Sequence, residues 1–282
     1  MKGRIDIEEG SLIALVIFTL MAIFIKGGGR DTQVLTLLSV ATFLYGMFIS
    51  FIFGSRHNRL NNLKSVLRSD DARYLNIYKF SEVFGKKVQK KVQTLIDNYF
   101  TSTIDYDLPE YYLAGPEFLK LFDYIKNLKP KTKAQDKVHS ELLDIVQDAN
   151  LNRKSVEQIA LSKMLPFKWV TLLSLLSVIL FSLFYVNNNS IASIFITVLL
   201  ATASVIMILV LRDIDSLMWK EEEWVWLPLD VVFGEMDLLP YYPDYMLSTE
   251  RRRLPKGTKL RIANYSNKYP DMSGKKVKVV TI

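Results

Sequence analysis

The sequence predicts an all-α membrane protein with four transmembrane helices, a helical cytoplasmic domain and a short basic C-terminal tail. Three observations support this fold class. Half of the 282 residues are hydrophobic although 23% are charged, and the mean hydropathy is +0.15. The apolar residues gather in four blocks that contain no charge. Between the second and third blocks, apolar residues recur with the spacing of amphipathic helices.

The four apolar blocks are residues 11–25, 33–54, 169–186 and 191–211. About 20 apolar residues cross a hydrocarbon core of roughly 30 Å, so the last three blocks are long enough to span it. The first block is about one turn short, but the neighbouring Lys26 can reach the headgroups. A cleaved signal peptide and an interfacial helix are the alternatives for this block. The two glutamates before it and the lack of a small-residue cleavage site favour a retained span.

Basic residues flank the apolar blocks and predict the topology. Arg56 and Arg59 follow the second block, Lys168 precedes the third and Arg212 follows the fourth. By the positive-inside rule these ends are cytoplasmic, so both termini are expected inside, in a plasma membrane of the bacterial inner-membrane type. The expected domains are 1–54 and 165–211 as two pairs of spans, 55–164 as the cytoplasmic helical domain, 212–250 as a juxtamembrane amphipathic segment and 251–282 as the basic tail.

The segments outside the membrane carry their own helix and strand signals. Ser69 followed by two aspartates predicts a helix N-terminus, and an apolar stripe then predicts one helix from Asp71 to about Phe100. Further helices are expected at residues 117–128 and from about Thr132 towards Pro166. Three tryptophans after the fourth block predict an amphipathic helix that lies along the inner leaflet or packs on the helical domain. In the tail, alternating stretches suit a small β-hairpin or extended arms.

Composition argues against most kinds of catalysis. The chain has no cysteine, which excludes disulfides, thiolate metal sites and thiol nucleophiles. Its two histidines, His57 and His139, lie far apart in the sequence. No glycine-rich phosphate loop, nucleophile elbow or zinc-protease motif occurs. We therefore expect no enzyme activity, no catalytic residue and no cofactor.

Small and hydroxyl residues share one face of two apolar blocks. In the second block this face is formed by Thr36, Ser39, Thr42, Gly46 and Ser50, which lie within an arc of about 120°. In the fourth block it is formed by Ser193, Thr197, Ala201 and Ser204. Such faces permit close helix packing, or they line a water-filled pore, and in an oligomer one face can do each. Because no Asp, Glu, Lys, Arg or His lies within the blocks, a proton-coupled carrier is disfavoured.

The charges after the fourth block are segregated by sign. Five carboxylates come first: Asp213, Asp215, Glu221, Glu222 and Glu223. They form either a solvated acidic collar that pairs with the tail or a site for a hard metal cation. The net charge of +7 is concentrated in residues 251–282, which hold ten basic residues and one acidic residue. The candidates for binding anionic lipid there are Arg251, Arg252, Arg253 and Lys256, and nucleic acid is the less favoured partner.

The order of these parts and three local patterns resemble the bestrophin-like domain family of bacterial membrane proteins, a family of unknown function. The patterns are RHNRLNNLKSVL after the second block, LPFKWVTLLSLL entering the third and LVLRDIDSLMW leaving the fourth. The family often has Arg-Pro after the last Asp-x-Asp, where this chain has Ser216-Leu217. True bestrophins, which are similar in having four spans, are pentameric anion channels with an acidic calcium-binding cluster after the fourth span. Residues 213–223 occupy the equivalent place.

These observations favour an oligomeric membrane protein that acts as a channel-like pore for small ions and is lined by the second block. The alternative is a membrane-anchored interaction or scaffold protein that uses its cytoplasmic helical domain and basic tail. The expected partners are the lipid bilayer, further copies of the same chain and anionic lipid at the tail.

Overall fold

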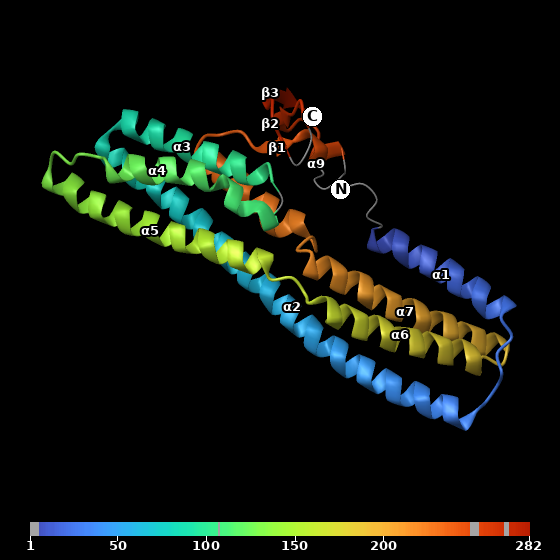
Figure 1. Cartoon of the computed structure of the whole chain (residues 1–282). Helices are drawn as coiled ribbons and strands as arrows, with labels where there is room; N and C mark the ends of the chain where they lie inside the picture. The colour runs from blue at the N-terminus through green and yellow to red at the C-terminus, as the bar shows by residue number, and fades with distance from the viewer. Residues whose placement is uncertain (1–5, 107, 249–253, 268–270) are drawn as a thin grey trace. The chain divides into compact units, whose positions relative to one another are not determined.

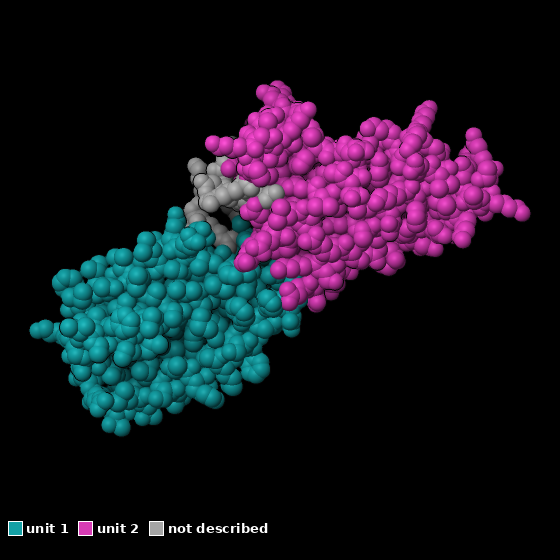
Figure 2. Space-filling view, turned by 180° about the vertical axis from the view of Figure 1, so that it is seen from behind, with its two compact units in different colours: residues 1–60, 163–219 teal, residues 61–162, 220–282 magenta. Residues whose placement is uncertain are grey.

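The computed structural model describes residues 6–106, 108–248, 254–267 and 271–282. These residues form two compact units, which Figure 2 shows in different colours. Unit 1 contains residues 1–60 and 163–219, and unit 2 contains residues 61–162 and 220–282. The chain therefore passes from unit 1 to unit 2 and back again before it ends in unit 2.

Unit 1 is built from long apolar helices. These are α1 (Ile7–Phe24), the first part of α2 (Thr32–Ser81), α6 (Pro166–Val186) and α7 (Ile191–Asp215). In the described part of the chain, four helices are long and apolar enough to cross a membrane, and each contains one of the four predicted blocks. Many of their large apolar side chains are exposed, as expected for helices whose outer surface faces lipid rather than water.

The helices of unit 1 pack side by side in the order α2, α6, α7, α1 (Figure 1). One cluster joins α2 to α6 through residues such as Tyr45, Ile49, Leu172 and Leu176. A second cluster joins α1 to α7 through small residues, of which Ala22 and Ala201 are fully buried. Small side chains allow two helix backbones to approach closely, which is the usual basis of helix association in lipid.

The loop between α1 and α2 packs closely on the loop after α6. The Asn187 amide is buried and donates a hydrogen bond of 3.0 Å to the backbone oxygen of Ala22. At Gly27, a Cβ atom would lie 2.2 Å from the backbone oxygen of Asn187. Only glycine therefore fits at this position, which explains the first member of the Gly27–Gly29 run in physical terms.

Helix α2 corrects one sequence-based expectation. The predicted N-terminus at Ser69 is wrong, because α2 continues without interruption from Thr32 to Ser81. The Ser69 hydroxyl accepts a hydrogen bond from Arg73 one turn later, and so does not cap the backbone. The helix ends instead at a short 3₁₀ turn, η1 (Glu82–Phe84), followed by Gly85 with a φ of 100°. This left-handed residue divides what was expected to be one helix between Asp71 and Phe100.

Unit 2 is a helical domain with a small sheet. After Gly85 come α3 (Lys86–Ile104), η2 (Leu108–Ala114), α4 (Gly115–Lys126) and α5 (Lys133–Leu161). The core is rich in aromatic residues, and the ring centroid of Tyr74 lies 5.1 Å from that of Tyr99 and 5.0 Å from that of Phe100. Helix α5 ends at Leu161, so the expected continuation into the third span does not occur.

The segment after the fourth span packs within unit 2. It contains η3 (Glu222–Trp226), which has π-helical geometry, and α8 (Leu227–Glu235). Trp224 and Trp226 are buried, and the Trp226 ring lies 6.1 Å from that of Tyr242. Of the two placements considered for these tryptophans, the structure therefore favours packing on the helical domain.

The remaining residues form α9 (Asp244–Ser248) and a sheet in the order β1 (Tyr241–Pro243), β2 (Lys259–Asn264) and β3 (Lys276–Thr281). Strands β2 and β3 pair in antiparallel fashion, which confirms the hairpin alternative for the tail. The parallel pairing of β1 with β2 was not predicted.

Candidate functional site

The polar face of α2 remains exposed in unit 1. All five predicted pore-lining residues, Thr36, Ser39, Thr42, Gly46 and Ser50, are exposed. The buried face of the same helix is formed by different residues, including Ala41, Tyr45, Ile49 and Ile52. At 100° per residue, Gly46 lies about 100° around the helix from Tyr45. The four-helix packing therefore leaves the small and hydroxyl residues of α2 accessible.

The hydroxyl groups of this face are satisfied within α2. The side chains of Thr36, Ser39 and Ser50 each donate to a backbone oxygen four residues earlier, at 2.8, 2.9 and 2.7 Å. Each hydroxyl oxygen still has lone pairs that can accept from water or a partner group. A Cβ atom added at Gly46 would meet no described atom within 4 Å outside the backbone of α2 itself, so the chain leaves open space there.

The corresponding face of α7 is used for packing. Thr197 and Ala201 are buried, and Ala201 belongs to the cluster that joins α7 to α1. Ser204 is half-buried, and its backbone oxygen accepts a hydrogen bond of 3.3 Å from the Tyr45 hydroxyl. The two polar faces therefore differ in the single chain, since that of α7 is largely covered and that of α2 is not.

A buried ion-pair cluster lies where α2 leaves the apolar block. The carboxylate of Asp215, at the end of α7, accepts a hydrogen bond of 3.3 Å from Arg56 and lies 3.8 Å from Arg59. The same Oδ1 atom accepts from the backbone N–H of Met164 at 3.0 Å. Arg59 also donates to the backbone oxygen of Asp215 at 2.7 Å. We call these four residues the Asp215 junction.

The Asp215 junction joins the middle of α2, the end of α7 and the segment that precedes α6. Arg56 and Arg59 come from α2, Asp215 from α7, and Met164 from the segment just before α6. The side chains of Asp215 and Arg59 are only 12% and 6% exposed. A charge buried to this extent requires a partner, so removing one member costs far more than at a surface ion pair. In the sequence, Arg56 and Arg59 indicate only the topology of the second span. The sequence signal for this cluster is an Arg-x-x-Arg motif after the second block together with an Asp-x-Asp motif after the fourth.

The structure distributes the five predicted metal ligands between the two units. Asp213 and Asp215 belong to unit 1, whereas Glu221, Glu222 and Glu223 belong to unit 2. Asp213 accepts from Arg212 at 2.9 Å, and Glu223 pairs with Lys220 at 3.1 Å. Among the described residues, no group of three or more carboxylates or histidines could hold a metal ion. The arrangement therefore gives the predicted cation site no support.

The basic tail has partners other than the acidic collar. Arg261 makes two hydrogen bonds of 2.7 and 2.8 Å to Asp97 on α3. Lys275 donates at 2.8 Å to Asp105, which also accepts from Tyr241 at 2.5 Å. These contacts fix the sheet to α3. The lipid-binding candidates Arg251, Arg252 and Arg253 lie outside the described residues, and Lys256 is exposed.

Comparison with known proteins identifies the family. No curated protein and no solved structure matches the chain. The model of the Bestrophin-like domain family matches residues 11–216. This range begins in α1, ends at the residue after the Asp-x-Asp segment, and contains every member of the Asp215 junction. The chain therefore belongs to the Bestrophin-like domain family, as its three sequence patterns indicated.

Proposed function

We propose that this protein assembles as a homo-oligomer around a channel-like pore for small ions, with the polar face of α2 lining the pore. The observation that carries the proposal is that this face stays exposed after the four apolar helices have packed. Against lipid tails, the hydroxyls and the open space at Gly46 would gain nothing. Against water or ions, the free lone pairs of the hydroxyls can act as ligands.

Two further observations support a passive conduit. The polar face of α7 is largely covered by packing, which leaves α2 as the better candidate for the wall. The four apolar segments contain no Asp, Glu, Lys, Arg or His, so the membrane core offers no charged residue for a proton relay. Under this proposal ions move down their gradient and the protein supplies the path without an energy source.

We propose that the segment after the fourth span gates the pore and that the Asp215 junction links this segment to the pore wall. Asp215 ties the end of α7 to α2 and to the residues before α6. Directly after it, the backbone oxygen of Asp213 accepts from the N–H groups of Met218 and Trp219 at 3.0 and 3.2 Å. A movement of this turn would therefore be transmitted to α2, which is the helix proposed to line the pore. We place this end of the spans in the cytoplasm of a bacterial cell, because the basic residues cluster there.

The test is ion flux through the purified full-length protein in liposomes. The critical variant is Gly46→Leu, because a Cβ atom added at this position meets no described atom within 4 Å outside the backbone of α2. We expect the wild type to conduct and Gly46→Leu to lose most of the flux. The matched control is Leu44→Val, which lies about 160° around the helix from Gly46 at nearly the same depth. Cross-linking before reconstitution shows whether both variants keep the wild-type oligomeric state. The absence of cation and anion flux from an intact wild-type oligomer would refute the proposal.

A membrane-anchored interaction protein is the second candidate, and strand β3 favours it. In the described sheet β3 is an edge strand, with Val277 and Val279 48% and 56% exposed. An exposed edge can accept a strand from a partner chain. Deleting the tail is a poor test, because it also removes the Arg261 and Lys275 ion pairs. Val279→Lys changes the exposed edge and leaves both ion pairs in place. It should abolish the binding of a partner strand at this edge, with ion flux unchanged.

A further inference from the structure

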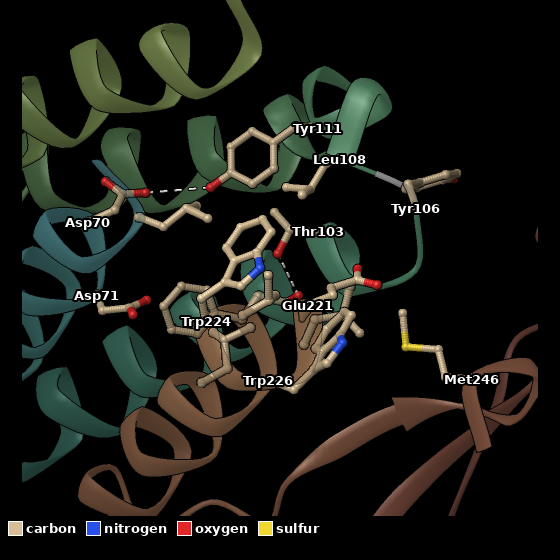
Figure 3. Close-up of a pocket in the computed structure, with 15 residues that line it drawn as sticks. Asp70, Asp71, Thr103, Tyr106, Leu108, Tyr111, Glu221, Trp224, Trp226 and Met246 are labelled. Carbon is tan, nitrogen blue, oxygen red and sulfur yellow. Dashed lines mark hydrogen bonds between the residues drawn. The ribbon is translucent and has the colours of Figure 1, made fainter. Parts of the chain in front are cut away.

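Unit 2 contains a small cavity that the pore proposal does not use. It has a volume of about 60 Å³ and is lined by residues of α2, α3, η2, η3, α8 and α9 (Figure 3). Its walls are mainly apolar, and they include the aromatic side chains of Phe100, Tyr111, Trp224 and Trp226. The cavity is therefore a shaped, largely apolar site of the kind that binds small molecules through a few polar groups.

The polar groups of the cavity are acidic. Asp70, Asp71 and Glu221 line it, and none of the described lining residues is a lysine, arginine or histidine. Three cations of α2 lie near the cavity without lining it: Arg68 and Arg73 act on the aspartates, and the Lys64 Nζ atom lies 5.8 Å from the centroid of the Trp224 ring. The charged side chains that line the cavity are all acidic, so its lining favours a cation over an anion.

The two aspartates differ in their partners. Asp70 is 3% exposed, and its Oδ2 atom accepts from the Tyr111 hydroxyl at 3.5 Å, a contact drawn in Figure 3. Its Oδ1 atom has no hydrogen-bond partner among the described residues. Asp71 is half-buried and receives no hydrogen bond or salt bridge from the part of the chain that the structure describes. Figure 3 shows its carboxylate directed towards the side of the cavity where Trp224 lies.

Trp226 adds an unused donor to the same cavity. Its side chain is 4% exposed, and its indole N–H has no acceptor among the described residues. In Figure 3 the indole nitrogen lies on the edge of the ring that faces Met246. A buried donor without an acceptor is costly, and a bound ligand with an acceptor atom would remove this cost.

We propose that this cavity binds a small organic ammonium ion that also carries a hydrogen-bond acceptor, with Asp71 as its counter-ion. The faces of Trp224, Trp226 and Tyr111 attract a cation through their ring quadrupoles, and the attraction increases when the cation is desolvated. The Trp226 N–H binds the acceptor atom of the ligand. A bare metal ion fits less well, because the described residues offer no group of three carboxylates or histidines around one point.

Proton release accompanies binding in this site. Burial raises the pKa of Asp71 to about 7 and that of Asp70 to about 8. Both residues lie in unit 2, and Asp70 is 16 residues, or about 24 Å of helix, beyond the apolar block that ends at Gly54. A cation favours the ionised carboxylate, so affinity increases as the pH rises from about 6 to about 8. The other charged or titratable groups around the cavity include Lys64, Arg68, Arg73, Tyr74, Tyr99, Tyr106, Tyr111, Arg153 and Glu221.

The first test uses the wild-type chain in detergent and needs no mutation. Choline is the probe, and its uncharged carbon isostere, in which carbon replaces the ammonium nitrogen, is the control. We expect choline to change the tryptophan fluorescence and to bind at least about tenfold more tightly than the isostere. Calorimetry in two buffers of different ionisation enthalpy should show protons released on binding. Equal affinity for the two probes, or no binding of choline at millimolar concentration, would overturn the proposal.

The second test assigns the counter-ion. Asp71→Asn keeps the size of the side chain and removes its charge, so choline affinity should fall at least about tenfold and lose its pH dependence. Asp144→Asn is the matched control, because Asp144 is exposed on α5 and does not line the cavity. It should bind choline like the wild type. An Asp71→Asn protein with the wild-type thermal transition and unchanged affinity would exclude Asp71. Since ion flux is not measured, this result is independent of the pore.

Discussion

Replacing Asp215 by alanine tests the most heavily connected polar group of unit 1. The substitution removes the acceptor of the Met164 N–H and the carboxylate beside Arg56 and Arg59. The hydrogen bond from Arg59 to the backbone oxygen of residue 215 can persist, because it does not involve the side chain. The change therefore isolates the carboxylate without removing the whole contact between α2 and α7.

The expected cost follows from burial. The two arginine side chains are 15% and 6% exposed, so they cannot regain full hydration when the carboxylate is lost. Breaking a buried ion pair costs about 3–5 kcal/mol, and an unsatisfied buried N–H costs about 1–3 kcal/mol. These terms overlap because they share Asp215, so we expect a total of about 3–5 kcal/mol for Asp215→Ala. Asp215→Asn keeps an oxygen for Met164 and should cost about half as much.

The assay is thermal unfolding of the full chain in detergent, followed by tryptophan fluorescence. For a chain of this size, each kcal/mol lowers Tm by about 2–4 °C, so Asp215→Ala should lower it by about 6–20 °C. Glu223→Ala is the control, since it removes a carboxylate from the same acidic stretch. Its side chain is 61% exposed and pairs with an exposed Lys220, so its effect should be below about 2 °C. If both alanine variants unfold at the wild-type temperature, the Asp215 junction does not stabilise the structure and our reasoning fails.

Three further predictions concern unit 2. Gly85→Ala forces a residue with a side chain into a φ of 100° and should lower the free energy of unfolding by about 1–3 kcal/mol. The control is Gly234→Ala, which lies within α8, where an added Cβ atom meets no neighbour. It should leave Tm unchanged or raise it in the same thermal assay. Arg261→Lys cannot keep both hydrogen bonds to Asp97 and should cost about 1–2 kcal/mol; an unchanged Tm would mean that one bond suffices. Because burial raises the pKa of Asp70 to about 8, the native state binds a proton more tightly than the unfolded state. Stability should therefore be greatest below about pH 4 for this group and decrease towards pH 8, and Asp70→Asn should flatten the decrease in urea unfolding measured across that range.

The membrane helices were predictable because one physical requirement dominates them. An apolar core of fixed thickness demands long uncharged segments, and the four blocks lie within α1, α2, α6 and α7. The residue at which a helix begins or ends depends on smaller differences in free energy between local capping and tertiary packing. Ser69 and its two aspartates form a legitimate local capping signal, but capping requires a non-helical backbone at the cap residue. The buried contacts of Leu63, Tyr74 and Ile77 keep α2 helical on both sides of Ser69. Tertiary packing therefore overrides the local preference.

The contacts between distant segments were harder to predict. Strand β1 has three residues, one of them Pro243, and all three are buried. It shows no alternation, so only its parallel neighbour β2 defines it as a strand. Asp215 and Arg56 were each visible as charges beside an apolar block. Their pairing depends on the end of α7 lying beside the middle of α2, which no spacing within either segment specifies. The polar face of α2 was predicted from helical periodicity alone, because its members lie in one helix.

The accessibility of single cysteines along α2 shows directly whether the polar face of this helix lines a pore. The chain has no cysteine, so a cysteine at Gly46 or Ser50 is the only thiol in the protein. We predict that a charged, membrane-impermeant methanethiosulfonate modifies both residues in liposomes and blocks ion flux. A cysteine at Leu44, on the other side of the buried face, should resist modification because it faces lipid. Modification of Leu44 with protection of Gly46 and Ser50 would show that the polar face of α2 is packed against protein or lipid, and would contradict a pore lined by this helix.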